Sequence, residues 1–312
     1  MTAEHTIFDR DLLTTRRERF AASAPQHDFL LRHVAEDLAH RLTLVRRRFP
    51  VGVNLGAYHG TVSRRLRDLG TVEVLLDLER SPRLLAQCAG PRILGDEEWL
   101  PFKAASLDLV ASGLALQLVK DLPGTLIQIR RALKPDGLML VALLGGRTLH
   151  ELRDALTEAE FEVEGGASPR IAPFADIRDL GGLLQRAEFA LPVADTDTLT
   201  VTYVTAFDLM RDLRRMGAAN MLRERRKLPL RRATLQRAAE IYAQRHGAAN
   251  GRIRATFDII TLTGWGPHES QQKALRPASA TARLAEALAT TEQPAGEKAG
   301  PQQLHVPKKA KT

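Results

Sequence analysis

The stretch from Val51 to Gly60 (Val-Gly-Val-Asn-Leu-Gly-Ala-Tyr-His-Gly) restricts the folds open to this chain more than any other part of the sequence. Its apolar first half, residues 51–55, predicts a buried strand, and the glycine-framed second half predicts a turn that leaves the strand. Apolar side chains then recur at helical spacing over residues 62–69. A strand, a glycine turn and a helix together present backbone N–H groups and a helix N-terminus to a nucleotide-like ligand. The sequence therefore predicts an α/β fold around a mostly parallel sheet.

Acids follow the next two predicted strands. Asp77 closes the apolar run that begins at Val72, about 20 residues beyond the glycine turn, where a nucleotide-binding sheet places a carboxylate for ribose hydroxyls. The alternative interpretation of Asp77 is a solvent-exposed acid at a strand end. Asp96 follows a strand that ends at Gly95, and its side chain can accept a hydrogen bond from the exocyclic amine of a purine.

The remaining patterns predict one main domain with additions at both ends. Residues 1–48 predict a helical lead-in, with Asp28 as a candidate helix cap. Lys134 to Gly137 predicts a turn with positive φ at Gly137. The later elements are an apolar strand over 138–144, a strand over 198–203, helices over 206–216 and 231–246, and a last strand over 253–260. We therefore expect one domain over 49–278 with a helical insertion over 206–248, and a mostly disordered basic tail over 279–312.

Composition excludes several kinds of site. The single cysteine, Cys88, rules out an internal disulfide, a cysteine-ligated zinc site and an iron–sulfur cradle, and we interpret it as a packed or surface helix residue. The net charge is +8, and the basic residues are scattered along the chain. This scatter favours solvated helix faces over an acidic partner or peripheral contact with a membrane surface, and it favours nucleic acid least. Because the N-terminus has neither a signal-peptide nor a transit pattern and no apolar run is long enough to span a membrane, we expect a cytoplasmic protein.

In this order and spacing, the motifs of residues 45–150 resemble the class I S-adenosylmethionine-dependent methyltransferases of the type 11 branch. The motifs are the glycine turn, the two acids, Ser106-Leu-Asp-Leu-Val110 and Leu133-Lys-Pro-Asp-Gly137. The resemblance implies a Rossmann-like class I sheet, mostly parallel with an antiparallel last strand, and S-adenosyl-L-methionine as the cofactor. It also implies cofactor contacts from Asn54, Gly56, Tyr58, Gly60, Asp77, Leu78, Asp96, Glu97 and Ser112.

A closer resemblance extends from Phe8 to Ala282. The stretches 96–102, Glu164-Gly-Gly-Ala-Ser-Pro169 and Gly264-Trp-Gly-Pro-His-Glu-Ser-Gln271 are similar to the respiratory complex I assembly factor 5 family and its alphaproteobacterial relatives. The malonyl-carrier methyltransferases of biotin synthesis are more distant. The resemblance implies either methylation of a protein or small-molecule substrate, or assembly of the NADH:quinone oxidoreductase. In the second case a subunit of that enzyme is the partner, and an arginine of its iron–sulfur subunit is the group that becomes hydroxylated.

Four residues depart from these families. Asn54 stands where the methyltransferases usually have an acid, and it lacks the charge that pairs with the cationic amino acid part of the cofactor. Tyr58 replaces the usual central glycine of the turn, where it either blocks the closest backbone approach or stacks on the ligand. Gln117 and Leu118 stand where the assembly family commonly has His-Trp. We expect these changes to weaken methyl transfer more than cofactor binding.

The residues that carry the chemistry are the least determined by the sequence. Methyl transfer needs in-line alignment and, for a protonated nucleophile, a base, and the candidates are His59 beside the glycine turn and, second, His150. A hydroxylase would need a metal site, but His59, His150, His268 and Glu269 show no recognisable ligand spacing, so none is predicted.

Other features predict the surroundings of the site. We expect the loop over 164–169 on the substrate side and both Trp99 and Tyr203 in the core. The stretch 264–271 fits a pocket wall or partner surface and, equally, a cap on the last strand.

Overall fold

The computed structural model describes residues 7–272, 286 and 288–291. Its contacts divide the chain into two units, Met1–Gln271 and Gln272–Thr312, and the first contains the whole sheet. The expected disordered tail over 279–312 lies outside the described residues, apart from residue 286 and residues 288–291. The proposed domain limit at residue 278 also lies outside them.

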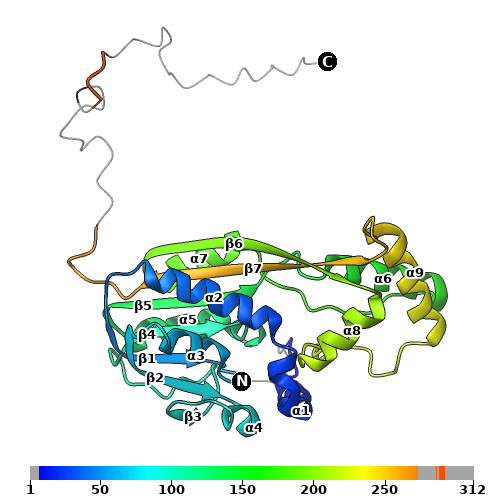
Figure 1. Cartoon of the computed structure of the whole chain (residues 1–312), viewed down its shortest axis with the longest axis horizontal. Coiled ribbons are helices and arrows are strands. Elements are labelled where there is room, and N and C mark those ends of the chain that lie inside the picture. The colour runs from blue at the N-terminus through cyan, green and yellow to red at the C-terminus, as the bar shows by residue number, and fades with distance from the viewer. Residues whose placement is uncertain (1–6, 273–285, 287, 292–312) are drawn as a thin grey trace, which may run out of the picture. The chain divides into compact units, whose positions relative to one another are not determined.

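One sheet organises the first unit. In the described chain it has the strand order β3-β2-β1-β4-β5-β7-β6, and the strands lie side by side in Figure 1. β7 is antiparallel to both β5 and β6, whereas the other neighbours are parallel. The prediction of a mostly parallel sheet with an antiparallel last strand is therefore confirmed. The strands are β1 (Phe49–Leu55), β2 (Val72–Glu79), β3 (Arg92–Leu94), β4 (Leu107–Gly113), β5 (Leu133–Leu144), β6 (Ala190–Tyr203) and β7 (Ile253–Trp265).

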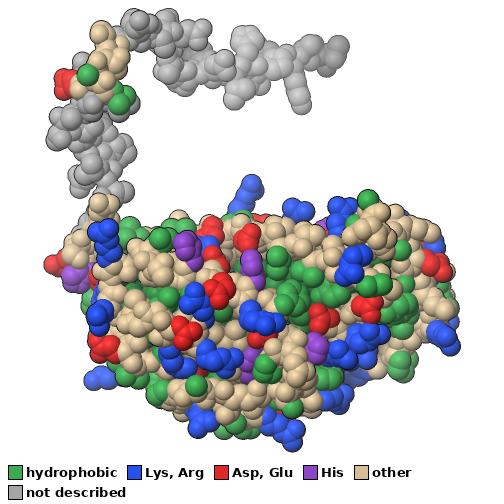
Figure 2. All heavy atoms as spheres, in the orientation of Figure 1, with side chains coloured by type: hydrophobic (Ala, Val, Ile, Leu, Met, Phe, Trp, Pro, Cys, Tyr) green, Lys and Arg blue, Asp and Glu red, His purple; other side chains and the backbone are tan. Residues whose placement is uncertain are grey.

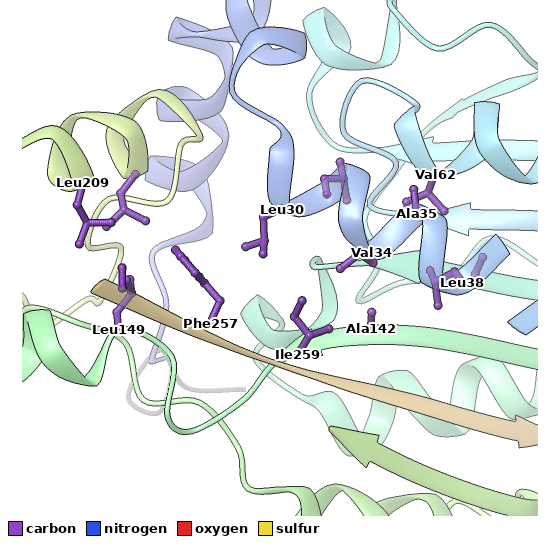
Figure 3. Packing of buried hydrophobic residues seen from close by; sticks show 14 of the residues in the cluster. Leu30, Val34, Ala35, Leu38, Val62, Ala142, Leu149, Leu209, Phe257 and Ile259 are labelled. Carbon is purple, nitrogen blue, oxygen red and sulfur yellow. The ribbon is translucent and has the colours of Figure 1, made fainter. Parts of the chain in front are cut away.

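Helices cover both faces of this sheet, which is why the central strands are apolar throughout. Residues of α2 and α3 pack in one core cluster, while residues of α5 and α7 pack in a second cluster on the other face. Figure 3 shows part of the first cluster, where α2 contributes Val34 and Leu38 and β7 contributes Ile259. The helices are α1 (Arg10–Arg19), α2 (Phe29–Thr43), α3 (Thr61–Arg67), α4 (Pro82–Leu85), α5 (Leu122–Ala132), α6 (His150–Glu164), α7 (Ile177–Arg186), α8 (Ala206–Arg215) and α9 (Arg232–His246), with 3-10 turns η2 (Ala21–Gln26) and η3 (Leu116–Leu118).

The helical insertion between β6 and β7 consists of α8 and α9, as expected. The capping box formed by Thr205 and Asp208 begins α8, and α9 packs along α6 at one end of the sheet (Figure 1). None of the helices in the described part of the chain is both long enough and apolar enough to cross a membrane.

Three local predictions were wrong. The strand predicted over 198–203 begins at residue 190, because β7 also pairs with its first half, an edge segment whose sequence does not alternate. In the turn before residue 138 the residue with positive φ is Asp136, at 61°, and not Gly137. Trp99 is 69% exposed and lies outside the core, whereas Tyr203 is half-buried and donates its hydroxyl hydrogen bond to Asp212.

Candidate functional site

The glycine turn between β1 and α3 lies at the carboxyl ends of the parallel strands, where ligands bind in open α/β sheets. Gly56 has a φ of 62°, and a Cβ atom there would lie 2.2 Å from the Cβ of Ala115. Gly60 has a φ of 84° and is the residue that precedes α3. These two positions require glycine, because φ is positive at both and Ala115 leaves no space for a side chain at Gly56.

Tyr58 ties the turn to the segments that cover it. Its backbone N–H donates to Oε2 of Glu79 at 2.8 Å, and its hydroxyl donates to the carbonyl of Met216 at 3.4 Å. The guanidinium carbon of Arg17 lies 5.4 Å from the centre of the tyrosine ring, a cation–π distance. Tyr58 thus connects the turn to α1 and to the end of α8.

The structure gives Asp77 a role different from the predicted one. Asp77 is fully buried in β2, where its Oδ1 accepts from Ser63 and its Oδ2 accepts from Nη2 of Arg67 at 2.7 Å. Both partners belong to α3, so the carboxylate holds that helix on the sheet. Ribose hydroxyls could bind this carboxylate only by displacing its ion pair with Arg67 or its hydrogen bond from Ser63.

Asn54 belongs to the same buried network. Its Nδ2 donates to Oγ of Ser63 at 2.8 Å, whereas its buried Oδ1 has no hydrogen-bond partner among the described residues. Unpaired buried acceptors are rare because each costs about 1–3 kcal/mol. This oxygen is therefore a candidate acceptor for the ammonium group of a bound amino acid moiety.

Glu79 is the acid that the sequence prediction missed. It is the last residue of β2, and its Oε1 and Oε2 accept from the backbone N–H groups of Ser81 at 2.9 Å and Tyr58 at 2.8 Å. Burial raises the pKa of this carboxyl above its ordinary value. We propose Glu79, in place of Asp77, as the ribose acid, because it sits at the strand end and faces the glycine turn. The available signal was the strand itself, since Asp77 and Glu79 share one face and Glu79 is nearer the turn.

The candidate adenine acids meet a buried arginine. Arg10, on α1, forms ion pairs with Asp96 at 2.6 Å, with Glu98 at 3.0 Å and with Glu97. Arg10 and Glu97 are both buried, while Asp96 is half-buried. The first helix of the chain is therefore fastened to the segment that the resemblance assigns to adenine.

His59 is buried inside the turn. Its Nε2 lies 3.2 Å from Oδ2 of Asp28, which also accepts from the hydroxyl of Thr61 at 3.0 Å. Burial lowers the pKa of His59, so the imidazole is held neutral at neutral pH. Asp28 precedes α2 as predicted, but its side chain binds the turn and makes no capping hydrogen bond. These contacts point to a structural role for His59.

The other residues singled out from the sequence lie in different places around the glycine turn and in the core. Ser112 is buried in β4, and its hydroxyl donates to the carbonyl of Leu55 at 2.8 Å. Leu78 is fully buried in the core between β2 and the second helix layer. Gln117 lies beside the turn and lines the cavity described below. Cys88 is buried, but it lies beyond the end of α4 and not in a helix, and burial raises the pKa of its thiol to about 12.

His150 lies apart from this group. It lines a separate cavity of about 240 Å³ with Arg147, Glu151, Thr200, His246, Arg254 and Thr256. Its Nδ1 lies 3.0 Å from the carbonyl of Arg147. In the described residues no three or more His, Cys, Asp or Glu side chains are arranged to hold a metal ion.

The stretch 264–271 caps the last strand and does not form a pocket wall. The side chain of Gln271 donates to Oδ1 of Asp136 at 3.1 Å and to the carbonyl of Gly266 at 2.9 Å. Because β7 is antiparallel, Trp265 pairs with Leu138 near the amino end of β5. The stretch therefore lies at the sheet edge opposite the glycine turn.

A chamber of about 810 Å³ opens beside the turn. Its walls come from α1, the start of α2, the ends of β1 and β4, α6, α8 and the segment that follows α8. Gly56, Tyr58 and Gly113 form its floor on the sheet side, and the loop after residue 169 contributes Arg170 and Ile171. Figure 3 shows Leu30 and Phe257 pointing into the space between α2 and α8.

S-adenosylmethionine fits these residues. Gly56 borders the chamber, Asn54 offers an unpaired acceptor, and Glu79 offers a carboxylate at the end of β2. Asp96 and Glu97 remain the candidates for the adenine amine. The bound cofactor supplies a methyl group on a sulfonium, and the chamber gives a substrate access to that end of the site.

The affinity for S-adenosylmethionine is expected to fall as the pH is lowered. The fall should begin at a pH above the pKa of an ordinary carboxyl group. Only the ionised form of Glu79 accepts from two ribose hydroxyls, and burial raises its pKa. Calorimetric titration between about pH 5 and pH 8 should show up to about a tenfold loss per pH unit below that pKa. For the ligand-free protein the sign is opposite, because the stability gained from protonated Glu79 is present at low pH and lost as the pH rises through its raised pKa. An affinity that stays constant down to about pH 4.5 would remove Glu79 from the site.

Known proteins share both sequence and fold with this chain. A family model for a methyltransferase domain matches residues 53–141. The chain is 38% identical over 288 residues to the mitochondrial arginine-hydroxylase NDUFAF5 of Danio rerio, covering 90% of this chain and 89% of that protein. It is 35% identical over 269 residues to the malonyl-[acyl-carrier protein] O-methyltransferase of Halorhodospira halophila, covering 83% and 89%. A methyltransferase structure from Bacillus halodurans, 14% identical, covers 75% of this chain and 100% of its own with a TM-score of 0.53, a likeness of fold alone.

Proposed function

Because this chain belongs to the class I S-adenosylmethionine-dependent methyltransferases, in the family that includes the arginine-hydroxylase NDUFAF5, we propose that it methylates a substrate held in the chamber beside the glycine turn. The chain is an S-adenosylmethionine-dependent enzyme. The observation that carries the proposal is that the chamber reaches Gly56 and Gly113, at the ends of β1 and β4. A substrate in the chamber and a cofactor on the turn would therefore meet at the carboxyl edge of the sheet.

His27 is the base candidate that this geometry favours over His59 and His150. It lines the chamber, and its Nδ1 lies 3.2 Å from Oδ1 of Asp212 on α8. When Nδ1 donates to Asp212, the Nε2 atom is left to accept a proton. Asp212 is held in turn by the hydroxyl of Tyr203 at 2.9 Å. The prediction from sequence missed His27 because Asp212 lies far along the chain.

Replacing His27 with Gln is expected to lower the rate of methyl transfer by about 10²–10⁴-fold, the usual contribution of a general base. The purified protein is incubated with methyl-labelled S-adenosylmethionine and with extract of cells that lack this protein, and the rate at which label is transferred is measured. His33→Gln is the matched control, because His33 pairs with Asp197 at 3.0 Å but does not line the chamber. Equal rates for both variants would remove His27 as the base. Absence of cofactor binding and of labelling by the unchanged protein would contradict the proposed function.

A second candidate comes from the relatives named as arginine-hydroxylases, which match about nine-tenths of this chain. Under it the protein matures the NADH:quinone oxidoreductase, and its partner is a subunit of that enzyme. Deletion of the gene would then impair NADH-linked quinone reduction, whereas unrelated methylation would leave that activity intact. We retain the cytoplasmic location predicted from the sequence as part of this proposal, although the relatives are named as mitochondrial.

A further inference from the structure

The charged residues around the chamber are overwhelmingly basic. Among the described residues that line the chamber, only Asp28 carries a carboxylate. Arg32, His59 and Thr61 already contact this carboxylate. Six arginines line the same chamber, and three of them have carboxylate partners outside it. These three are Arg170 with Glu160, Arg225 with Asp9, and Arg226 with Glu164.

The other three arginines have no ion-pair partner within the described part of the chain. Arg16 donates only to the carbonyl of Asn220, and burial together with the nearby Arg225 lowers its pKa. Arg17 has a buried Nε without a hydrogen-bond partner and lies over the ring of Tyr58. Arg214 lies in the last turn of α8. Cations gathered in this way without counterions favour an anionic ligand.

The rest of the lining is apolar. Leucines from α6 (Leu152 and Leu156), Ile171 and Phe257 form much of the wall, and the 810 Å³ volume is large enough for a chain of several carbons with its head group. Figure 2 shows the molecule in the orientation of Figure 1. Hydrophobic side chains gather on the half where α8 and α9 lie, with basic side chains around them. The chamber thus combines an apolar interior with three guanidinium groups that form no ion pair with the described residues.

We propose that the chamber binds an amphiphilic anion, with a carboxylate or phosphate head group at Arg16, Arg17 and Arg214 and an apolar chain against the leucines of α6. This inference rests on the proposed function, because it takes the chamber as the place where the substrate meets the cofactor. This basic lining favours the proposed methylation of an anionic substrate over the second candidate, in which an arginine side chain would enter the chamber.

The test compares probes that share one apolar chain and differ only in the head group: decanoate, decyl phosphate, decanol and decyltrimethylammonium. Titration of the full-length protein, with and without S-adenosylmethionine, should show one or both anions binding at least about tenfold more tightly than decanol. The tighter anion identifies the head group. Equal affinities for all four probes, or tightest binding of the cation, would overturn the proposal.

Variants locate the effect. Arg16→Gln, Arg17→Gln and Arg214→Gln should each reduce the preference for the anion, whereas Arg186→Gln should not, because Arg186 ends α7 on the other face of the sheet. An unchanged preference in all three chamber variants would also overturn the proposal. The head-group series on the unchanged protein tests the proposal even if a variant does not fold. Cofactor binding measured in the same samples separates the two ideas: binding of the cofactor without a preference for anions defeats this inference and leaves the proposed function standing.

Discussion

Glu79→Gln is expected to weaken S-adenosylmethionine binding by about 100-fold, the largest effect on affinity expected of a single substitution in this site. A carboxylate that accepts from both ribose hydroxyls makes two charge-assisted hydrogen bonds, each worth about 1.5–3 kcal/mol. The amide keeps the size of the side chain but loses the charge and turns one acceptor into a donor. Because both carboxylate oxygens also accept backbone N–H groups, we expect a loss of about 1–3 kcal/mol in the free energy of unfolding as well.

Asp77→Asn is the matched control for this prediction. It should lower the free energy of unfolding by about 3 kcal/mol, because Arg67 and Ser63 lose a buried charged partner. Cofactor affinity of the folded variant should stay within about threefold of the original, a difference below 1 kcal/mol. Calorimetric titration and urea denaturation of both variants give the two quantities separately. If Asp77→Asn loses the cofactor and Glu79→Gln keeps it, the assignment of the ribose acid to Glu79 is wrong.

Arg10→Ala is expected to lower the free energy of unfolding by about 3–5 kcal/mol, the largest effect on stability expected of a single substitution. The change removes the shared partner of three carboxylates and leaves Asp96, Glu97 and Glu98 to repel one another around a buried site. Equilibrium unfolding in urea measures the loss.

Arg65→Ala provides the control for the stability experiment. Arg65 on α3 pairs with Glu36 at 2.7 Å, but both side chains are exposed, so its removal should cost at most about 1 kcal/mol. Arg10→Lys keeps the charge but cannot contact three carboxylates in the geometry of a guanidinium, and an intermediate loss is expected. A loss for Arg10→Ala no greater than that for Arg65→Ala would contradict the view that this cluster fastens α1 to the sheet.

The parts of the candidate site that lie close together in the sequence were predictable from it. The glycine turn, the acid-bearing end of β2 and the segment after β3 lie within about fifty residues, and the order of these motifs sufficed to place them on one sheet edge. The strand pattern puts Asp77 and Glu79 on one face of β2, with Glu79 nearer the turn, but it does not show which of the two carboxylates α3 engages. Only the packing of α3 shows that Ser63 and Arg67 engage the first and leave the second beside the turn.

The sequence by itself determined the α/β class, the antiparallel last strand and the family, because apolar periodicity and motif spacing are local properties of the chain. Tertiary structure alone decided which acid faces the turn, that Arg10 closes on the acids after β3, and that His27 meets Asp212 over a chamber lined with arginines. Those residues come from both ends of the domain and are joined only when α1 and α8 pack over the sheet. The packing of the helices sets the direction in which each side chain points, and that direction decides its partner. The pattern of residues along the sequence does not contain this information.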